Sequence, residues 1–259
     1  MYPQELAVEK ISASLKKDPL VQAVFLKGSM GRNEHDEFSD IDLYCLVNKE
    51  DENQFLSNRL EHLQAYRPII FQDDIFIIAP QMIAVFDDLL HIDLFTVTMD
   101  SFQEKDYFKV IDDPNHLLDK FIDSQSLTLS ENEYRDDVSD VAWFLFQYKK
   151  AAARGNTIWA VRMLTNVMVH LARVLLYRYA PHRAQLGLKT IDQSLPKSLV
   201  PKLENIFEHI TLCKHRKACY LLCTLVSEEY EWIDLQLPQE TQIKHLLRKM
   251  VEFHVEKGN

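Results

Sequence analysis

The chain has 259 residues, 47% of them hydrophobic, which is enough for one large domain or two ordinary ones with a real core. Its 39 acidic residues outnumber its 29 basic ones and give a formal net charge of −10. This balance argues against a surface that grips nucleic acid, because phosphate binding relies on accumulated lysine and arginine. A local basic pocket is still compatible with it.

No segment reaches the roughly 18 uninterrupted apolar residues of a membrane span. The best candidate, "IFIIAPQMIAVF", is broken by Pro80 and Gln81. The opening "MYPQELAVEKISASLKKDP" predicts a helix and has no apolar signal core. Four cysteines in a chain of this size do not indicate a disulfide framework. We therefore expect a cytoplasmic protein that does not enter a membrane.

Three of the cysteines lie close to two histidines in the C-terminal half. Cys213, Cys219 and Cys223, with His209 and His215, fit no zinc spacing. The surrounding "KACYLLCTLV" is typical of a buried helix, so we interpret the thiols as small core residues.

The first half of the chain mixes strand and helix patterns. They predict strands over 23–28 and 41–47, a helix over 51–66, and two strands within 82–98 that are joined through Asp87 and Asp88. Together they indicate a sheet with helices on it.

A polar stretch over 123–133 has the composition of a connection, and the rest of the chain is almost entirely helical in pattern. One helix is predicted over 135–154 and, after a break at Gly155-Asn156, another over 157–179, with at least two more to follow. We expect an α+β protein in which residues 1–125 form a mixed β-sheet flanked by helices. Residues 126–259 are expected to form an all-α helical bundle.

Asp40 and Asp42 are separated by one isoleucine at the start of the strand "IDLYCLV". Residues two apart in a strand project from one face, so the two carboxylates would lie side by side. Because two close anions repel, the pattern favours a divalent cation between them. An edge strand with an exposed polar face would give the same pattern.

Asp93 lies within another apolar strand, "HIDLFTVT", and shares its face with His91 and Phe95. It is a candidate third carboxylate for the same site. A lone acid in a strand is also compatible with simple exposure to solvent.

These motifs occur together in one order. "KGSMGR" follows an apolar strand, "SDIDL" comes next and "HIDLF" follows later. The combination resembles the nucleotidyltransferase superfamily typified by DNA polymerase beta. The domain order is similar to that of the bacterial antibiotic nucleotidyltransferases, which modify aminoglycosides or lincosamides and carry a helical C-terminal domain.

The resemblance implies an enzyme that transfers a nucleoside monophosphate, in this branch of the superfamily AMP from ATP, to a hydroxyl of a small-molecule acceptor and releases pyrophosphate. Negative charge builds up during the in-line attack on the α-phosphorus, and two Mg²⁺ ions neutralise it. By this resemblance Asp40 and Asp42 would ligate both ions, and Asp93 would complete the site for the ion that activates the acceptor.

The loop before the aspartates is expected to hold the triphosphate. The Gly28-Ser29 turn lets backbone amides and the serine hydroxyl approach it, and Arg32 would add a charge-assisted hydrogen bond. Arg32 is also compatible with an ordinary solvated loop. Gly31 and Asn33 depart from the superfamily pattern, in which alanine and glycine are common at these positions.

The helix over 135–154 carries a polar stripe. At about 100° per residue, Asp140, Gln147, Lys150 and Arg154 fall within one stripe about 80° wide. Either it is a solvated face, or Lys150 and Arg154 reach the triphosphate while Asp140 lies near the acceptor. Aminoglycoside adenylyltransferases carry a similar run of an acid, an aromatic pair, a lysine and an arginine.

Two other functions stay open from the sequence. One is a minimal nucleotidyltransferase that modifies a protein, as antitoxins beside a helical toxin partner do. The other is a catalytically silent protein that keeps nucleotide binding. We expect the partners to be a nucleoside triphosphate and a small-molecule acceptor bound in a cleft between the domains, with no nucleic acid and no membrane.

Overall fold

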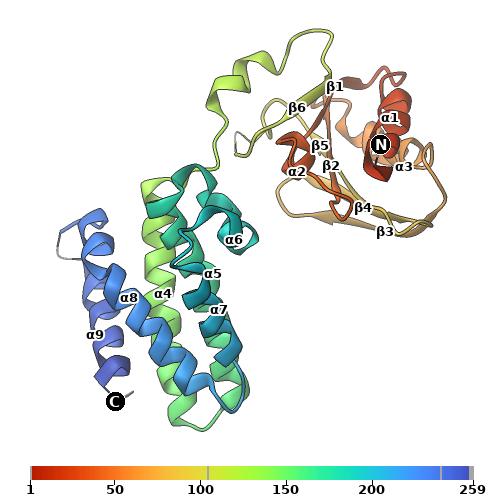
Figure 1. The fold of residues 1–259 in the computed structure, drawn as a ribbon. Coiled ribbons are helices and arrows are strands. Elements are labelled where there is room, and N and C mark those ends of the chain that lie inside the picture. The colour runs from red at the N-terminus through yellow and green to blue at the C-terminus, as the bar shows by residue number, and fades with distance from the viewer. Residues whose placement is uncertain (1, 104, 240, 257–259) are drawn as a thin grey trace. The chain divides into compact units, whose positions relative to one another are not determined.

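The computed structural model describes residues 2–103, 105–239 and 241–256. The chain divides into two compact units, Met1–Ser126 and Leu127–Asn259. The strands belong to the first unit and the long helices to the second (Figure 1). For the residues that the structure describes, the predicted α+β class is confirmed.

The first unit begins with a helix and continues with strands and further helices. Its elements are α1 (Pro3–Leu15), β1 (Val21–Leu26), α2 (Gly28–Gly31), β2 (Ile41–Val47), α3 (Glu52–Leu63), β3 (Ile69–Phe76), β4 (Pro80–Phe86), β5 (His91–Val97), β6 (Lys109–Asp112) and the 3-10 helix η1 (Asp119–Ser124). The predicted strands correspond to β1, β2, β4 and β5, and the predicted helices to α1 and α3. The boundaries differ by a few residues, and β1 in particular ends at Leu26, because Gly28 already begins a helical turn.

Among the described residues, six strands form one mixed sheet in the order β3-β4-β5-β2-β1-β6. Neighbouring strands are antiparallel except β2 and β5, which are parallel. A parallel pair needs a long connection, and here α3 and the β3–β4 hairpin supply it. The two strands that carry the predicted carboxylates therefore lie next to each other.

Side chains alternate between the two faces of this sheet. One face packs against α1 and α3 through a core that includes Val24, Leu26, Ile41, Leu43, Ile92 and Leu94. The opposite face packs against residues from 99–121 through a core that includes Phe25, Tyr44, Phe95 and Val97. Burying each of these large apolar side chains contributes roughly 1.5–3 kcal/mol to folding.

The second unit contains only helices and turns in the part that the structure describes. Its elements are α4 (Glu131–Ala153), α5 (Thr157–Tyr179), η2 (Pro181–Thr190), α6 (Ile191–Ser194), α7 (Val200–His209), α8 (His215–Gln236) and α9 (Gln242–Glu256).

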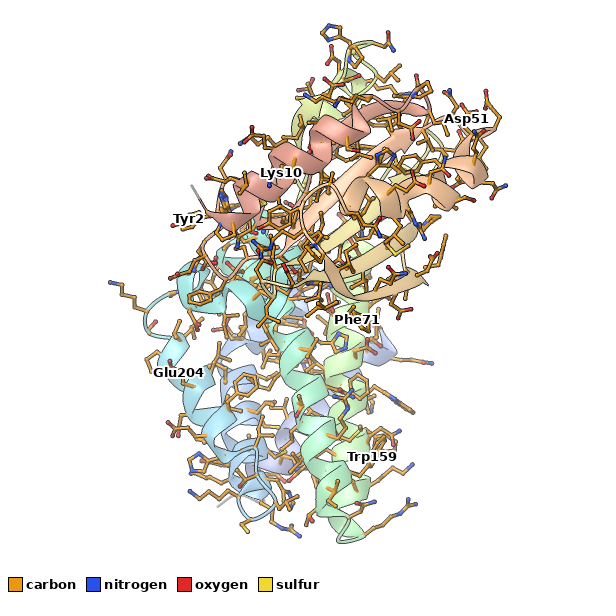
Figure 2. The ribbon with its side chains drawn as sticks, turned by 90° about the vertical axis from the view of Figure 1, so that its right-hand side faces the viewer. Tyr2, Lys10, Asp51, Phe71, Trp159 and Glu204 are labelled. Carbon is orange, nitrogen blue, oxygen red and sulfur yellow. The ribbon has the colours of Figure 1, made fainter. Side chains whose placement is uncertain are left out.

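The first two long helices have clear start and stop signals. Ser130 and Glu133 form a capping box at the start of α4, each side chain accepting the other's backbone N–H. Gly155 has a φ of 70°, and Asn156 caps α5 by accepting from the backbone N–H of Trp159 at 3.2 Å. The predicted break at Gly155-Asn156 is confirmed. Trp159 is itself half-exposed in the first turn of α5 (Figure 2).

The helix α5 is long and apolar enough, by length and composition, to cross a membrane. Arg162, Asn166 and Arg173 interrupt it, so the expectation that no segment has about 18 uninterrupted apolar residues still holds. Half of the apolar window is buried inside the structure, and the buried side chains form a core with α4 and α8. A core helix of this unit accounts for the same composition.

The cysteines are all free thiols, and none is in a disulfide. Cys219 and Cys223 are buried in α8, as predicted. The prediction is wrong for Cys213, which is exposed in the turn before that helix.

Candidate active site

Asp42 on β2 and Asp93 on β5 occupy the same register position of the parallel pair. Their neighbours Ile41 and Ile92 point into the core under α1 and α3. By alternation the two carboxylates therefore lie on the opposite face, beside Tyr44 and Phe95. The structure brings these two predicted residues together.

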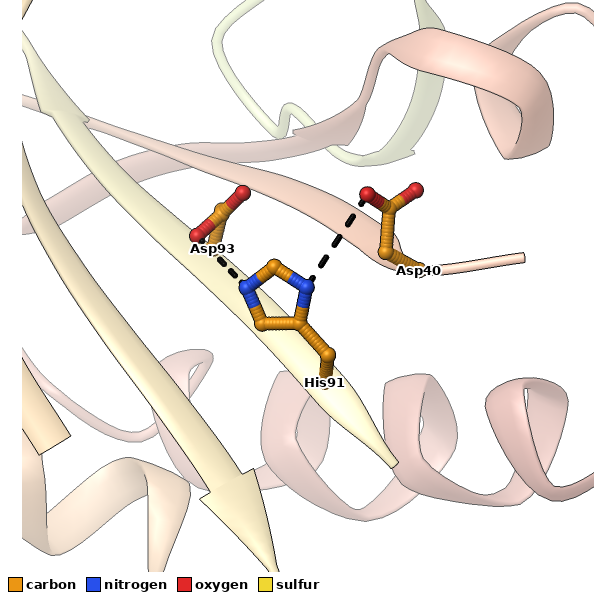
Figure 3. Close-up of side chains that lie close together, drawn as sticks. All are labelled: Asp40, His91 and Asp93. Carbon is orange, nitrogen blue, oxygen red and sulfur yellow. Dashed lines mark hydrogen bonds and ion pairs between the residues drawn. The ribbon is translucent and has the colours of Figure 1, made fainter. Parts of the chain in front are cut away.

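Asp40 lies immediately before β2 begins, and its side chain is half-exposed. His91 lies between it and Asp93 (Figure 3). The Nε2 of His91 is 3.1 Å from an oxygen of Asp93, and its Nδ1 is 4.0 Å from an oxygen of Asp40. One ligand atom from each of the three residues lies within 4.8 Å of the others. This arrangement links the two predicted carboxylates through a histidine.

The electrostatics of the group follow from its three acids. The hydrogen bond with Asp93 raises the pKa of His91 above its ordinary value. Burial of the ring opposes the shift, while the charges of Asp93, Asp40 and Asp42 add to it. The site is therefore a centre of negative potential that favours a cation.

The oxygen and nitrogen atoms of this group are suitable ligands for a divalent metal ion. Carboxylate oxygens are the ligands that Mg²⁺ and Mn²⁺ prefer, and an imidazole nitrogen is accepted by Mn²⁺ and other transition metals. Asp40, His91 and Asp93 already lie close enough to share one ion. Asp42 lies on the same face as Asp93 but is not one of the three residues of this cluster.

The turn after β1 approaches Asp42 very closely. Gly28 has a φ of 60°, and a Cβ atom built on it would lie 1.9 Å from the Oδ2 of Asp42. Only glycine fits a left-handed position with a carboxylate at this distance. The glycine therefore allows the predicted phosphate loop and the predicted metal ligand to be neighbours.

Ser29 follows in the same turn. Its Oγ is buried and has no hydrogen-bond partner among the residues that the structure describes. A buried hydroxyl without a partner costs free energy, so such a group in a native protein calls for a ligand or a water molecule. The hydroxyl is available to a phosphate oxygen.

Arg32 is not a solvated loop residue. Its Nη1 donates to Asp106 at 2.5 Å and its Nε to Glu34 at 2.9 Å, and the side chain is 12% exposed. Burial lowers the pKa of Arg32, but the hydrogen bonds to Asp106 and Glu34 outweigh it and the pKa is raised. The proposed phosphate contact of Arg32 stays a prediction, and it would require exchange of one of these partners.

Sequence reasoning missed Lys27, a buried cation directly before the glycine. Its Nζ donates to the backbone carbonyls of Gln103 at 2.6 Å and Lys105 at 3.0 Å, and lies 5.0 Å from the centre of the Phe102 ring. Burial lowers the pKa of Lys27 to about 8, although Asp106 partly opposes the shift. The sequence signal was a lysine at the end of an apolar strand.

Lys27 helps to line a cavity of about 200 Å³ beside Asp42. The aromatic rings of Phe25, Tyr44 and Phe102 form much of its wall. A site with a carboxylate at its rim and aromatic walls is suited to an organic ligand.

The other three candidates belong to α4 in the second unit. Asp140 is half-exposed and lies 3.6 Å from the Nε2 of His170, while the Nζ of Lys150 lies 5.4 Å from the centre of the Phe146 ring. Arg154 is the C-cap of the helix and is exposed. Their roles toward nucleotide and acceptor stay predictions.

Residues 9–85 match the model of a family described as "Polymerase beta, Nucleotidyltransferase". The match runs from α1 into β4 and includes Gly28, Ser29, Asp40 and Asp42, but stops before Asp93. Residues 9–85 are thus similar to the polymerase beta nucleotidyltransferase family, in agreement with the resemblance of the sequence motifs. No curated protein matches the chain.

Solved structures of similar overall length were also found. An aminoglycoside 6-adenyltransferase from Bacillus subtilis is 12% identical, with 98% of both chains covered and a TM-score of 0.40. A nucleotidyltransferase-like protein from Exiguobacterium sibiricum is 13% identical, with 98% of this chain and 91% of that chain covered and a TM-score of 0.34. A CD-NTase from Bradyrhizobium diazoefficiens in complex with GTP is 12% identical, with 99% of this chain and 87% of that chain covered and a TM-score of 0.31. Likenesses at this level say nothing about the substrate.

Proposed function

We propose that the chain is a Mg²⁺-dependent adenylyltransferase that transfers AMP from ATP to a hydroxyl of a small molecule, such as an aminoglycoside or lincosamide antibiotic. The observation that carries the proposal is the shared register of Asp42 and Asp93, with Asp40 joined to Asp93 through His91. Three carboxylates gathered at one place on a sheet favour the binding of cations over any role in packing.

In this reaction the acceptor oxygen forms a bond to the α-phosphorus, the bond to pyrophosphate breaks, and the hydroxyl gives up its proton. Bound Mg²⁺ ions would neutralise charge on the attacking and leaving oxygens. Asp40, Asp42 and Asp93 would hold those ions. His91, through its hydrogen bond, would keep the carboxylate of Asp93 in position.

The phosphates would lie on the turn after β1. The Gly28 backbone approaches Asp42 closely, and the buried Oγ of Ser29 needs a partner. An oxygen of the triphosphate would supply that partner and would lie next to the metal ligands. Arg32 would also contact the triphosphate if a phosphate oxygen replaced Glu34 or Asp106 as its hydrogen-bond partner.

The helical unit, residues 126–259, would supply the acceptor contacts. Lys150 and Arg154 would reach the triphosphate, and Asp140 would orient a cationic group of the acceptor or help to take its proton. The acidic composition of the chain, with a net charge of −10, suits a cationic acceptor better than a nucleic acid. ATP, Mg²⁺ and the free cysteines are consistent with action in the cytoplasm.

The test is to incubate the protein with ATP labelled at the α-phosphate, Mg²⁺ and a panel of aminoglycosides, lincosamides and cell extract. The proposal predicts label on a small molecule together with release of pyrophosphate. Label on a protein of the extract alone would instead show a protein-modifying enzyme. Binding of ATP without any labelled product would show a silent protein.

A further inference from the structure

The helical unit has a cavity of about 680 Å³ that plays no part in the proposed reaction. It is formed by the last turns of α4, the first turns of α8 and the end of α9. In Figure 1 the end of α9 lies at the same end of this unit as the turn between α4 and α5. The residues that matter for its chemistry are Tyr148, Lys149, Arg216, Lys217, Tyr220 and Phe253. A cavity of this size can hold a nucleotide-sized ligand.

Three cations line the cavity, and no described carboxylate does. Within the described part of the chain, Lys149, Arg216 and Lys217 have no carboxylate oxygen within 4.0 Å. Arg216 and Lys217 are exposed and Lys149 is partly buried, so all three can reach a ligand in the cavity. Their combined potential favours an anionic ligand.

Two of these cations lie at the N-terminus of a helix, where positive charge is generally disfavoured. The sequence "KHRK" over 214–217 supplies the N-cap and first turn of α8, which contain no acid and no side-chain cap. In the same unit, α4 begins with Ser130 as its cap and Glu131 and Glu133 in its first turn.

Aromatic rings accompany the cations. The Nζ of Lys149 lies 4.4 Å from the centre of the Phe253 ring, and the Nζ of Lys217 lies 4.9 Å from that of Tyr220. The hydroxyl of Tyr148 lies 3.0 Å from the Nδ1 of the buried His215, which fixes the ring at the inner wall. Flat rings next to unpaired cations suit a ligand that has both an aromatic base and phosphates.

We propose that this cavity is a second ligand site, which binds a nucleoside phosphate. The phosphates would contact Arg216 and Lys217, and the base would pack among the rings of Tyr220, Phe253 and Tyr148. Inorganic phosphates share the anionic part of this chemistry but lack the base. The inference does not depend on the proposed transfer reaction, because every residue in it belongs to the helical unit.

The test uses ADP and the full chain in EDTA, so that a metal-dependent site in the first unit does not retain the nucleotide. Calorimetry should show saturable binding of ADP, with inorganic pyrophosphate binding more weakly. The photoreactive analogue 8-azido-ADP should label peptides that contain Tyr148, Tyr220 or Phe253. Labelling confined to the first unit would overturn the proposal, and equal affinity for pyrophosphate would overturn the part that concerns the base.

Variants separate binding from folding. Lys217→Glu places an acid in the first turn of α8, so it should leave the melting temperature unchanged or raised while ADP affinity falls by about tenfold or more. Lys149→Ala, which leaves that turn intact, should also lower the affinity for ADP. Lys197→Ala is the control, because this exposed lysine of the same unit does not line the cavity. Unchanged ADP affinity in both folded cavity variants would contradict the proposal.

Discussion

Asp42 and Asp93 are register partners on two neighbouring parallel strands, although 50 residues of chain separate them. Neighbouring strands are about 4.8 Å apart, so the two carboxylates start from adjacent points on one face of the sheet. Asp40 and His91 lie at the same end of the two strands. The site therefore depends on the pairing of β2 with β5. Replacing one of its carboxylates by an amide should change the site and leave the fold intact.

Asp42→Asn and Asp93→Asn should each lower turnover by more than about a hundredfold, about 2.7 kcal/mol of barrier, because each removes an anionic ligand without changing shape. Steady-state rates with labelled ATP and circular dichroism would measure activity and fold together. Asp73→Asn is the matched control, since this aspartate is exposed on β3. Turnover of Asp42→Asn within about tenfold of the parent would show that the carboxylate is not a metal ligand.

Two glycines offer a matched comparison at the phosphate turn. Gly28 and Gly155 both have a positive φ, but a Cβ at Gly155 would meet nothing within 4 Å. Gly155→Ala should therefore lower the free energy of unfolding by about 1 kcal/mol and leave turnover unchanged. Gly28→Ala should lower stability in the same way and should also displace Asp42, so most of the turnover should be lost. Equal activity of the two variants would mean that Gly28 has only a conformational role.

Lys150→Ala should raise the KM for ATP by about tenfold, because it removes a charge-assisted contact to the triphosphate. Asp140→Asn should change the KM for the acceptor instead. Lys189→Ala, which alters another exposed lysine of the helical unit, is the control. If Lys150→Ala and Lys189→Ala behave alike, the polar stripe of α4 is simply a solvated face.

His215 should make the helical unit sensitive to acid. Burial, assisted by the charge of Arg216, lowers the pKa of His215 below its ordinary value of 6.5. Between that lowered pKa and 6.5 the unfolded chain binds a proton that the folded chain does not, so stability falls as the pH decreases through this window. His215→Asn keeps an acceptor for Tyr148 but cannot be protonated, and should flatten this part of the stability profile. An identical profile in urea titrations of the two proteins from pH 7 to 5 would disprove the assignment.

Several elements could be predicted because local chemistry decides them. Largely buried apolar runs mark β2, β4 and β5, and Gly155-Asn156 separates the two long helices. The strand β3 was missed because it lies at the sheet edge, where Phe71 on it is exposed (Figure 2) and the sequence "IIFQDDIF" shows no alternation. An edge strand exposed along its length has no buried face to produce a pattern.

The site could be predicted only in part, for a similar reason. The spacing of Asp40 and Asp42 places them on one face, but the pairing of β2 with β5 is a long-range feature. The contact from Lys27 to Gln103 spans 76 residues and leaves no local trace. His91 had a signal, since it lies two residues before Asp93 on the same face, and its hydrogen bond with Asp93 could have been inferred from that position.

The most direct test is a crystal structure with Mn²⁺ and a non-hydrolysable ATP analogue, in which anomalous scattering locates the ions. The account predicts manganese bound by the carboxylates of Asp40, Asp42 and Asp93, with phosphate oxygens at the Gly28-Ser29 turn. Asp42→Asn crystals under the same conditions should lose an ion. Manganese absent from these carboxylates, with the analogue bound elsewhere, would contradict the account.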